Sequence, residues 1–280
     1  MLFEQQTLNC RGRLLDLSQP IVMAILNLTP DSFYDGGVYQ SDKQMLAKVD
    51  QFISEGATII DIGGMSSRPG AEIISPEEEM KRVLPSILQI KKQFPETIIS
   101  IDTLSAKVAE AAVEAGASIV NDISAGRFDE AMIPLVGTLK TPYIAMHMLR
   151  TPATMQQAPE YDDVCETVLR FFIERIALCR KAGIKDVILD PGFGFGKTVA
   201  HNYELLRNME LFRVLELPIL AGISRKSMIY KPLEIKAEEA LNGTTALHMV
   251  CLQQGARILR VHDVKEAVET VKLWKLMVSK

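Results

Sequence analysis

The chain has 280 residues, of which 48% are hydrophobic and 24% charged, a composition typical of a folded globular protein rather than a disordered one. Its 31 basic and 35 acidic residues leave a formal net charge of -4, so no overall positive field exists to bind nucleic acid or an anionic membrane. This length would suit one (β/α)8 barrel, which usually takes about 250 residues.

The N-terminus and the cysteines predict a cytoplasmic protein. Residues 1–6 lack the basic and apolar regions of a signal peptide, and no segment approaches the ~18 apolar residues of a membrane span. The cysteines Cys10, Cys165, Cys179 and Cys251 lie far apart without a C-x-x-C pair. They are therefore expected to be reduced, packed thiols and not a zinc site or a disulfide framework.

Taken in chain order, the pattern begins with a predicted β-hairpin in residues 1–17, whose turn lies at Cys10-Arg11-Gly12-Arg13. Eight apolar, β-rich segments follow, at residues 21–28, 58–63, 97–102, 118–123, 143–148, 186–190, 219–223 and 257–262. Amphipathic segments alternate with them, for example 41–55, 104–115 and 165–182. This alternation predicts an α/β fold, a (β/α)8 TIM barrel, in preference to an open doubly wound sheet. No linker divides the chain, so we expect a single domain over residues 1–280.

One helix start is marked clearly by Ser75-Pro76-Glu77-Glu78-Glu79. Ser75 suits the N-cap and Pro76 the first helical position. The three glutamates that follow are expected to complement the helix dipole and to face solvent, and not to form an acid/base cluster.

Polar residues gather where the predicted strands end. In a (β/α)8 barrel these ends form the active-site face, and burying so many polar groups without a ligand would be costly. The strand-end residues are Asn27, Asp61, Ser66, Ser67, Arg68, Asp102, Asn121, Asp122, His147, Asp190, Ser224, Arg225, Lys226, Arg260 and His262. They predict a ligand site at this face.

These residues divide into two chemical groups. Asp102, Asn121 and Asp190 can read a planar heterocycle that is rich in hydrogen-bond donors. Arg260 and His262 lie two positions apart, so on a strand they share a side, where they could hold an anion together with Arg68. Lys226 could bridge the two groups. The combination indicates a neutral heterocycle with a phosphorylated arm.

The segment Pro191-Gly192-Phe193-Gly194-Phe195-Gly196-Lys197-Thr198 nearly matches a nucleotide-binding P-loop. That motif requires glycine where Pro191 stands, and it belongs at the start of a nucleotide-binding chain. We expect the glycines instead to let the backbone and Phe193 or Phe195 approach a flat ligand.

In this order, seven motifs resemble those of the dihydropteroate synthase family over essentially the whole chain. They are 27–33 (NLTPDSF) with Asp35-Gly36-Gly37, 63–70 (GGMSSRPG), 101–103 (IDT), 121–122 (ND), 190–197 (DPGFGFGK), 224–227 (SRKS) and 260–264 (RVHDV). The first is the most diagnostic, because a plain strand-exit turn would not explain it beside the others.

The resemblance implies a homodimeric barrel enzyme of folate biosynthesis. It would join (7,8-dihydropterin-6-yl)methyl diphosphate to para-aminobenzoate, with Mg²⁺ as cofactor, releasing diphosphate and 7,8-dihydropteroate. By the same resemblance, the pterin would be held by Asp102, Asn121, Asp190 and Lys226, with Arg260 stacked on its ring. The diphosphate would be surrounded by Asn27, Ser67, Arg68, Arg260 and His262, of which Asn27 contacts the metal. Phe33, Phe195 and Ser227 would flank the aminobenzoate, and Asp35 would steady charge at the reacting methylene.

The second motif departs from the family, which commonly has Glu-Ser-Thr-Arg where this chain has Met65-Ser66-Ser67-Arg68. Ser67 keeps the hydroxyl, whereas Met65 removes a charge. Two alternatives share a pterin pocket: a pterin-dependent corrinoid methyltransferase and a non-catalytic pterin-binding homologue. The methyltransferase would not need the first-strand loop, and the homologue would not need Arg68, Arg260 and His262 together.

Overall fold

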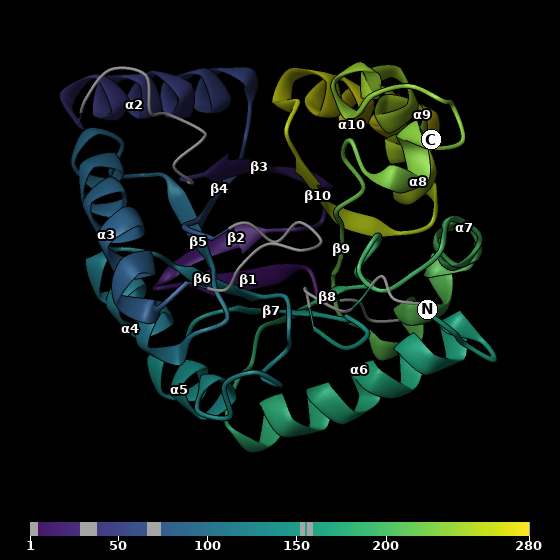
Figure 1. Cartoon of the computed structure of the whole chain (residues 1–280), viewed down its shortest axis with the longest axis horizontal. Helices are drawn as coiled ribbons and strands as arrows, with labels where there is room; N and C mark the ends of the chain where they lie inside the picture. Colours follow the sequence, from purple (N-terminus) through teal and green to yellow (C-terminus); the bar gives the residue numbers. More distant parts are fainter. Residues whose placement is uncertain (1–4, 29–37, 66–73, 152–154, 156–158, 280) are drawn as a thin grey trace.

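The computed structural model describes residues 5–28, 38–65, 74–151, 155 and 159–279. Eight parallel strands in this part of the chain close into a barrel with helices around it, which confirms the predicted TIM barrel (Figure 1). Around the barrel the order is β10-β3-β4-β5-β6-β7-β8-β9. The strands are β3 (Ile21–Asn27), β4 (Ile59–Gly63), β5 (Ile98–Asp102), β6 (Ile119–Asp122), β7 (Tyr143–Met146), β8 (Val187–Asp190), β9 (Ile219–Ala221) and β10 (Ala256–Val261).

Helices follow the strands and cover the outside of the barrel. They are α2 (Val38–Glu55), α3 (Pro76–Gln93), α4 (Ala106–Ala115), α5 (Met132–Leu139), α6 (Val164–Lys181), α7 (Val199–Arg207), α8 (Ser227–Tyr230), α9 (Leu241–Gln253) and α10 (Val264–Val278), with 3-10 turns η1 (Met209–Leu215) and η2 (Ala237–Glu239). Outward strand residues such as Ile60, Ile99 and Val120 pack with helix residues such as Val83 and Val108 in one large apolar core. Burial on both faces explains why the strands are almost continuously apolar.

The predicted N-terminal hairpin is confirmed as β1 (Thr7–Cys10) and β2 (Arg13–Asp16), with Arg11 and Gly12 at positive φ in the turn. Its side chains Leu8, Leu15 and Leu17 pack against the first inward-facing residues of the barrel strands, including Met23 and Ile59. The hairpin therefore closes the N-terminal end of the barrel with apolar contacts, and substrates must enter from the other end.

The helix start at Ser75 is confirmed, because its side chain accepts a hydrogen bond from Glu78 N and Pro76 begins α3. The interpretation of the three glutamates holds for two of them. Glu77 pairs with Lys107 and Glu78 with Arg82. It is wrong for Glu79, which is 3% exposed, because its position on α3 turns it toward the barrel.

The cysteines and the helices agree with the expectations from composition. All four thiols are free and buried, as predicted. Among the described residues, no helix combines the length and the apolar character needed to cross a membrane.

Candidate active site

The period-two alternation of the strands places the site. The first inward-facing residues, among them Ile59, Ile119, Ile188 and Ile258, belong to the apolar layer under the hairpin. Two positions further along each strand the side chain returns to the same face. Those positions are occupied by Asp61, Asn121, Asp190 and Arg260, and Asp102 lies four positions after Ile98. The inside of the barrel is thus apolar at one end and polar at the other.

An ion-pair cluster lies at the polar end. Arg260 Nε donates to Asp61 Oδ2 at 2.6 Å, and Arg260 Nη2 donates to Asp102 Oδ2 at 2.8 Å. Asn121 Nδ2 donates to the same Asp61 oxygen at 3.1 Å. Asp61 has 0% exposure, whereas Asp102 and Arg260 keep 11% and 16% of their side-chain surface. The buried carboxylate therefore orients the arginine and the amide, while Asp102 remains reachable.

The pKa values of Asp102 and Arg260 depend on each other's charge. Burial raises the pKa of the Asp102 carboxyl; Arg260 opposes the shift, and Asp61 adds to it. Burial alone would lower the pKa of Arg260, but Asp61 and Asp102 outweigh it and raise that pKa. The guanidinium is therefore permanently charged. Because its pKa is raised, Asp102 takes up a proton at a higher pH than an ordinary aspartate does. It can therefore donate or accept a hydrogen bond toward a heterocycle.

Asp190 and Lys226 form the second part of the polar cluster. Burial raises the pKa of Asp190, opposed by Lys226, and burial lowers the pKa of Lys226 to about 8, opposed by Asp190. Lys226 Nζ donates to Phe193 O and lies 4.6 Å from the centre of the Phe195 ring. A Cβ at Gly222 would lie 3.9 Å from both Lys226 Nζ and Arg260 Cβ. Arg260 also lowers the pKa of Lys226, so the two cations are close enough to repel each other.

His262 lies just beyond β10 and joins the end of β9. Its Nδ1 is 3.1 Å from Ser224 Oγ, and its backbone N–H donates to the same hydroxyl at 3.2 Å. Burial, and next Arg260, lowers the pKa of His262 to about 4, so its imidazole is neutral at neutral pH. The neighbouring Arg225 does not face the site, because it forms a bidentate pair with Asp263 at 2.8 and 2.7 Å.

An apolar cluster borders the cations. It contains Phe195, 8% exposed, with Leu104, Ile123, Met146, Met148 and Met155. Met65 packs against this cluster. The departure at residue 65 thus adds an apolar side chain beside Phe195, where the family motif has a carboxylate. Ser227 begins α8 directly after Lys226 and is half-buried there.

The remaining predicted site residues differ in what the structure says of them. Phe33, Asp35, Ser67 and Arg68 lie outside the described residues. Asn27 ends β3, and a Cβ at Gly63 would lie 3.6 Å from both Asn27 Oδ1 and Asp102 Cβ. Its amide oxygen therefore reaches the edge of the polar cluster.

Two strand-end residues from the sequence pattern belong elsewhere. Asp122 faces away from its neighbour Asn121 and accepts hydrogen bonds from Ser124 and from Tyr143 Oη, at 2.7 and 2.8 Å. His147 contacts Lys197. In contrast, the sequence pattern marks Asp61 as a strand-end residue but predicts no contact with a substrate for it. Its place two residues after Ile59, on the inward face, was the signal that could have identified it.

The glycine-rich turn at residues 191–196 lies between β8 and α7, and its interpretation as something other than a P-loop stays a prediction. Gly192, Gly194 and Gly196 all have positive φ. A Cβ at Gly192 would lie 1.9 Å from His147 O, so this glycine is required by close packing between two strand-end loops. The expected approach of Phe193 and Phe195 to a flat ligand stays a prediction.

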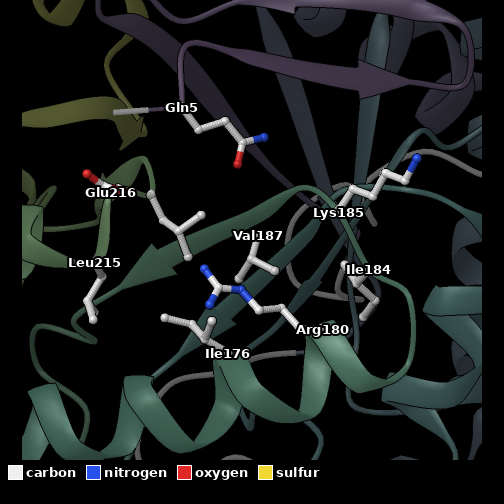
Figure 2. A pocket seen from close by; sticks show the side chains of 9 residues that line it. Gln5, Ile176, Arg180, Ile184, Lys185, Val187, Leu215 and Glu216 are labelled. Atoms are coloured by element: carbon white, nitrogen blue, oxygen red, sulfur yellow. The ribbon is translucent and has the colours of Figure 1, made fainter. Parts of the chain in front are cut away.

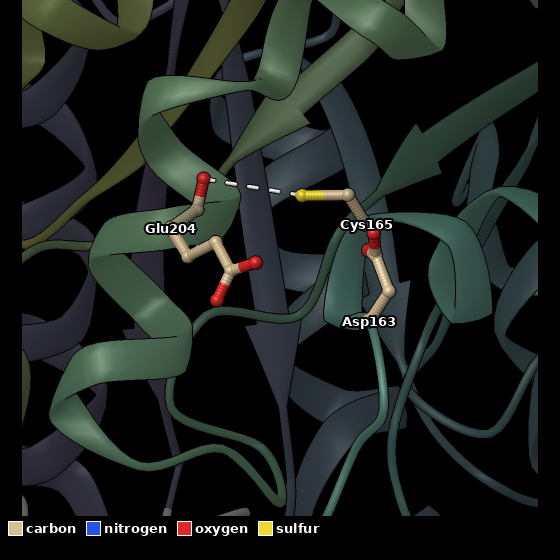
Figure 3. A group of neighbouring side chains, drawn as sticks. All are labelled: Asp163, Cys165 and Glu204. Atoms are coloured by element: carbon tan, nitrogen blue, oxygen red, sulfur yellow. Dashed lines mark hydrogen bonds between the residues drawn. The ribbon is translucent and has the colours of Figure 1, made fainter.

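Two other features lie away from the polar strand ends. A pocket of about 420 Å³ at the start of β8 and β9 is lined by residues that include Gln5, Arg180, Lys185 and Glu216 (Figure 2). Asp163, Cys165 and Glu204 come together between α6 and α7 (Figure 3). Asp163 caps α6, and burial raises the pKa of the Cys165 thiol to about 11, which disfavours a metal-binding thiolate. Neither feature contributes to the polar cluster.

Comparison with known proteins agrees with this geometry. Residues 23–262 match the family model described as "Pterin binding enzyme". The chain is 46% identical over 271 residues to a dihydropteroate synthase of Escherichia coli (strain K12), covering 96% of this chain and 95% of the relative.

Solved structures of the same enzyme superpose closely. A Yersinia pestis dihydropteroate synthase in complex with a sulfonamide drug is 42% identical, with a TM-score of 0.92, covering 98% of this chain and 100% of the other. A Xanthomonas albilineans dihydropteroate synthase with 4-aminobenzoic acid is 40% identical, with a TM-score of 0.91, covering 98% and 99%. These similarities favour the synthase over the methyltransferase alternative. The chain belongs to the pterin-binding enzyme family, within which it is a dihydropteroate synthase.

Proposed function

We propose that the polar end of the barrel binds the pterin diphosphate and para-aminobenzoate in adjoining subsites. The observation that carries this proposal is the Asp61–Arg260–Asp102 cluster, which presents carboxylates beside a fixed cation. Asp102, Asn121 and Asp190 offer the acceptors and the amide that a pterin ring requires, and Lys226 lies between them and the aromatic side. Arg260 stacks on the pterin, and Asp61 orients it.

The anionic arm is assigned to Asn27, Ser67, Arg68, Arg260 and His262. His262 borders Arg260, and its neutral ring can take up a proton when a diphosphate brings negative charge close, because an adjacent anion raises a histidine pKa. Arg68 and Ser67 are assigned to the anionic arm because they belong to the family motif at residues 63–70. Together these groups stabilise negative charge as the diphosphate departs.

The aminobenzoate is assigned to the apolar cluster around Phe195, with Ser227 at one side and Phe33 from the first loop. The Xanthomonas albilineans relative was solved with 4-aminobenzoic acid. An aniline nitrogen is already a nucleophile, so its attack on the pterin methylene needs orientation and not a strong base. Asp35 steadies the positive charge that develops on the pterin as the C–O bond breaks, and Lys226 and Asp102 hold the ring during the displacement.

We infer that the metal is Mg²⁺ and that Asn27 contacts it. The donor set fits, because Mg²⁺ usually takes one or two protein oxygens and completes its shell with water and substrate phosphates. Asn27 Oδ1 is such an oxygen at the end of β3, next to the edge where Asp102 lies. When bound, the metal ion would neutralise charge on the leaving diphosphate. Orientation of the pterin and exclusion of water remain tasks of the side chains described above.

A homodimer is also proposed. Large apolar side chains are exposed on η1 and on the last turns of α10: Leu211, Val214, Leu273, Leu276 and Met277. These elements adjoin α9, since Glu210 N donates to Gln254 Oε1 and α9 packs along α10 (Figure 1). A second copy of the chain would bury this surface, as the family resemblance implies. Cytoplasmic residence is supported by the four unpaired thiols.

The activity is tested by mixing the purified chain with Mg²⁺, dihydropterin diphosphate and para-aminobenzoate. We expect diphosphate release and dihydropteroate formation in equal amounts. Asp190→Asn should abolish most of both, whereas Asp162→Asn, at an exposed position, should leave them unchanged. Tight pterin binding without any product would favour the non-catalytic alternative.

A further inference from the structure

Lys197 is a buried lysine that pairs with no carboxylate in the part of the chain that the structure describes. It is 3% exposed, and none of the ion pairs among the described residues includes it. Its ammonium instead contacts four neutral acceptors. Nζ lies 2.9 Å from His147 Nδ1, 2.9 Å from Gly192 O, 3.2 Å from Phe195 O and 3.4 Å from His147 O. Three carbonyls and a ring nitrogen therefore converge on one ammonium group.

Burying an ammonium group costs free energy that an apolar side chain at residue 197 would not cost. A role for the ammonium would explain why a lysine stands there. Burial lowers the pKa of Lys197 to about 7, with Asp190 opposing the shift, so the protein destabilises this charge. Burial, followed by Lys197, also holds the pKa of His147 well below its usual value. The imidazole is therefore neutral, and its Nδ1 can accept from the ammonium. The hydrogen bonds compensate in part for the lost hydration.

The acceptors of the Lys197 ammonium belong to His147 and to the turn that follows β8. Gly192 and Phe195 are the two ends of the turn that follows β8, and they are bridged by the hydrogen bond from Phe195 N to Gly192 O at 3.1 Å. The same turn accepts Lys226 Nζ at Phe193 O and presents the Phe195 ring to that lysine. It also donates from Gly194 N to Asn202 Oδ1 at 2.7 Å. The turn thus carries the boundary between the two proposed subsites.

His147 anchors the other side. Its backbone N–H donates to Asp190 O at 3.0 Å, and its ring packs edge-on against Phe171, with centres 4.9 Å apart. His147 is therefore fixed to both β8 and α6. Lys197 connects this anchor to the carbonyl oxygens of Gly192 and Phe195. Loss of the ammonium would therefore release these two carbonyls of the turn, whereas the ends of the strands would stay in place.

We propose that Lys197 is a positioning residue for the aminobenzoate subsite: its ammonium ties the 192–195 turn to His147 and so sets the place of Phe195 beside Lys226. The proposal rests on the proposed role of Phe195 in flanking the aminobenzoate. Lys197 itself does not touch either substrate. Its contribution is to the geometry of the subsite, so it affects the binding of one substrate more than the other.

The test compares Lys197→Met with wild type in the full enzyme, with Mg²⁺ present. We expect the KM for para-aminobenzoate to rise about tenfold, because small displacements of a positioning group are amplified in the reacting complex. The Kd for dihydropterin diphosphate, measured by calorimetry, should stay within about twofold, because pairing with Met146 on β7 holds Asp190 in place without Lys197. Lys92→Met, at an exposed position of α3, is the matched control and should change neither constant.

The KM distinguishes positioning from simple loss of folded protein, because a smaller active fraction lowers the rate at every concentration and leaves the KM unchanged. If Lys197→Met does not fold, Lys197→Gln keeps two donors and is measured in the same way. A KM within twofold of wild type, or an equal rise in the KM and the pterin Kd, would overturn the proposal.

A double-mutant cycle with Phe195→Ala tests the route of the effect. If Lys197 acts through Phe195, Lys197→Met should add less than twofold to the KM of Phe195→Ala, since residues that act together are not additive. Full additivity would overturn that route. If Phe195→Ala alone leaves the KM unchanged, the assignment of Phe195 in the proposed function is wrong. An unchanged KM in Lys197→Met beside a raised one in Phe195→Ala overturns the Lys197 proposal alone.

Discussion

Arg260 Nε and Asp61 Oδ2 lie 2.6 Å apart inside the barrel, although 199 positions separate them in the sequence and β3 lies between their strands. The same guanidinium reaches Asp102 on β5. One side chain on β10 therefore contacts carboxylates from the second and third strands along the barrel wall. The pairs with Asp61 and Asp102 fix the direction of the guanidinium at the polar end of the barrel.

Replacing Asp61 should disturb both stability and catalysis. Asp61→Asn removes one charge that faces Arg260 and leaves Asp102 as its ion-pair partner among the described residues. We expect the free energy of unfolding to fall by about 3 kcal/mol, as when one member of a buried pair is lost. Pterin binding should weaken as well. Urea denaturation and calorimetry measure the two effects, with Asp162→Asn as the control; a change below 1 kcal/mol would show that Asp102 alone suffices.

Asn27 offers a test of the proposed metal contact. Asn27→Ala removes the amide oxygen near Gly63 and Asp102. We expect the Mg²⁺ concentration for half-maximal activity to rise about tenfold, since Mg²⁺ has few protein oxygens to lose. Because Asn27 is also assigned to the diphosphate arm, binding of the pterin diphosphate should weaken in both conditions, but less without Mg²⁺ than with it. Gln93→Ala removes an exposed amide and serves as the control. An unchanged Mg²⁺ requirement would remove Asn27 from the metal assignment.

The buried Glu79 carboxyl should make the free energy of unfolding depend on pH. Burial raises its pKa from 4.5 to about 7, against the effects of Thr103 and Arg82. Between these values the folded state keeps a proton that the unfolded state has lost, so stability falls as the pH rises from 4.5 to 7. Glu79→Gln cannot ionise, so its free energy of unfolding should gain on wild type by up to about 1.4 kcal/mol per pH unit across this range.

Denaturation at several pH values checks the Glu79 prediction. Glu110→Gln, at an exposed position of α4, should follow the wild-type curve throughout. Parallel curves for Glu79→Gln and wild type would mean that the Glu79 carboxyl titrates normally in the folded protein.

The proposed dimer surface can be tested at Leu276, which is 74% exposed on α10. A charge there would have to be desolvated in an interface, so Leu276→Arg should raise the dimer dissociation constant at least about tenfold. Sedimentation over a range of concentrations measures it. Leu88→Arg, on α3 and 57% exposed, is the matched control. Equal sedimentation of both variants would place the interface elsewhere.

The order of the amino acids is enough to predict the fold class and most of the strand-end residues. Apolar strands in alternation with amphipathic helices favour a barrel over an open sheet, and the strand ends mark candidate site residues because a barrel has one active-site face. The eight strands and the N-terminal hairpin lie where this pattern predicted them, to within a few residues. The cap at Ser75 was equally local, because it depends on a hydrogen bond three residues away.

The pairing of these residues, in contrast, depends on how the strands and helices pack in three dimensions. Sequence spacing could not show that Asp61 faces Arg260, that Asp122 turns to Tyr143, or that Glu79 is buried, because each contact joins distant segments. Lys197 illustrates the same limit. Its motif is readable in the sequence, but the convergence of His147, Gly192 and Phe195 on its ammonium depends on the packing of two neighbouring strand ends.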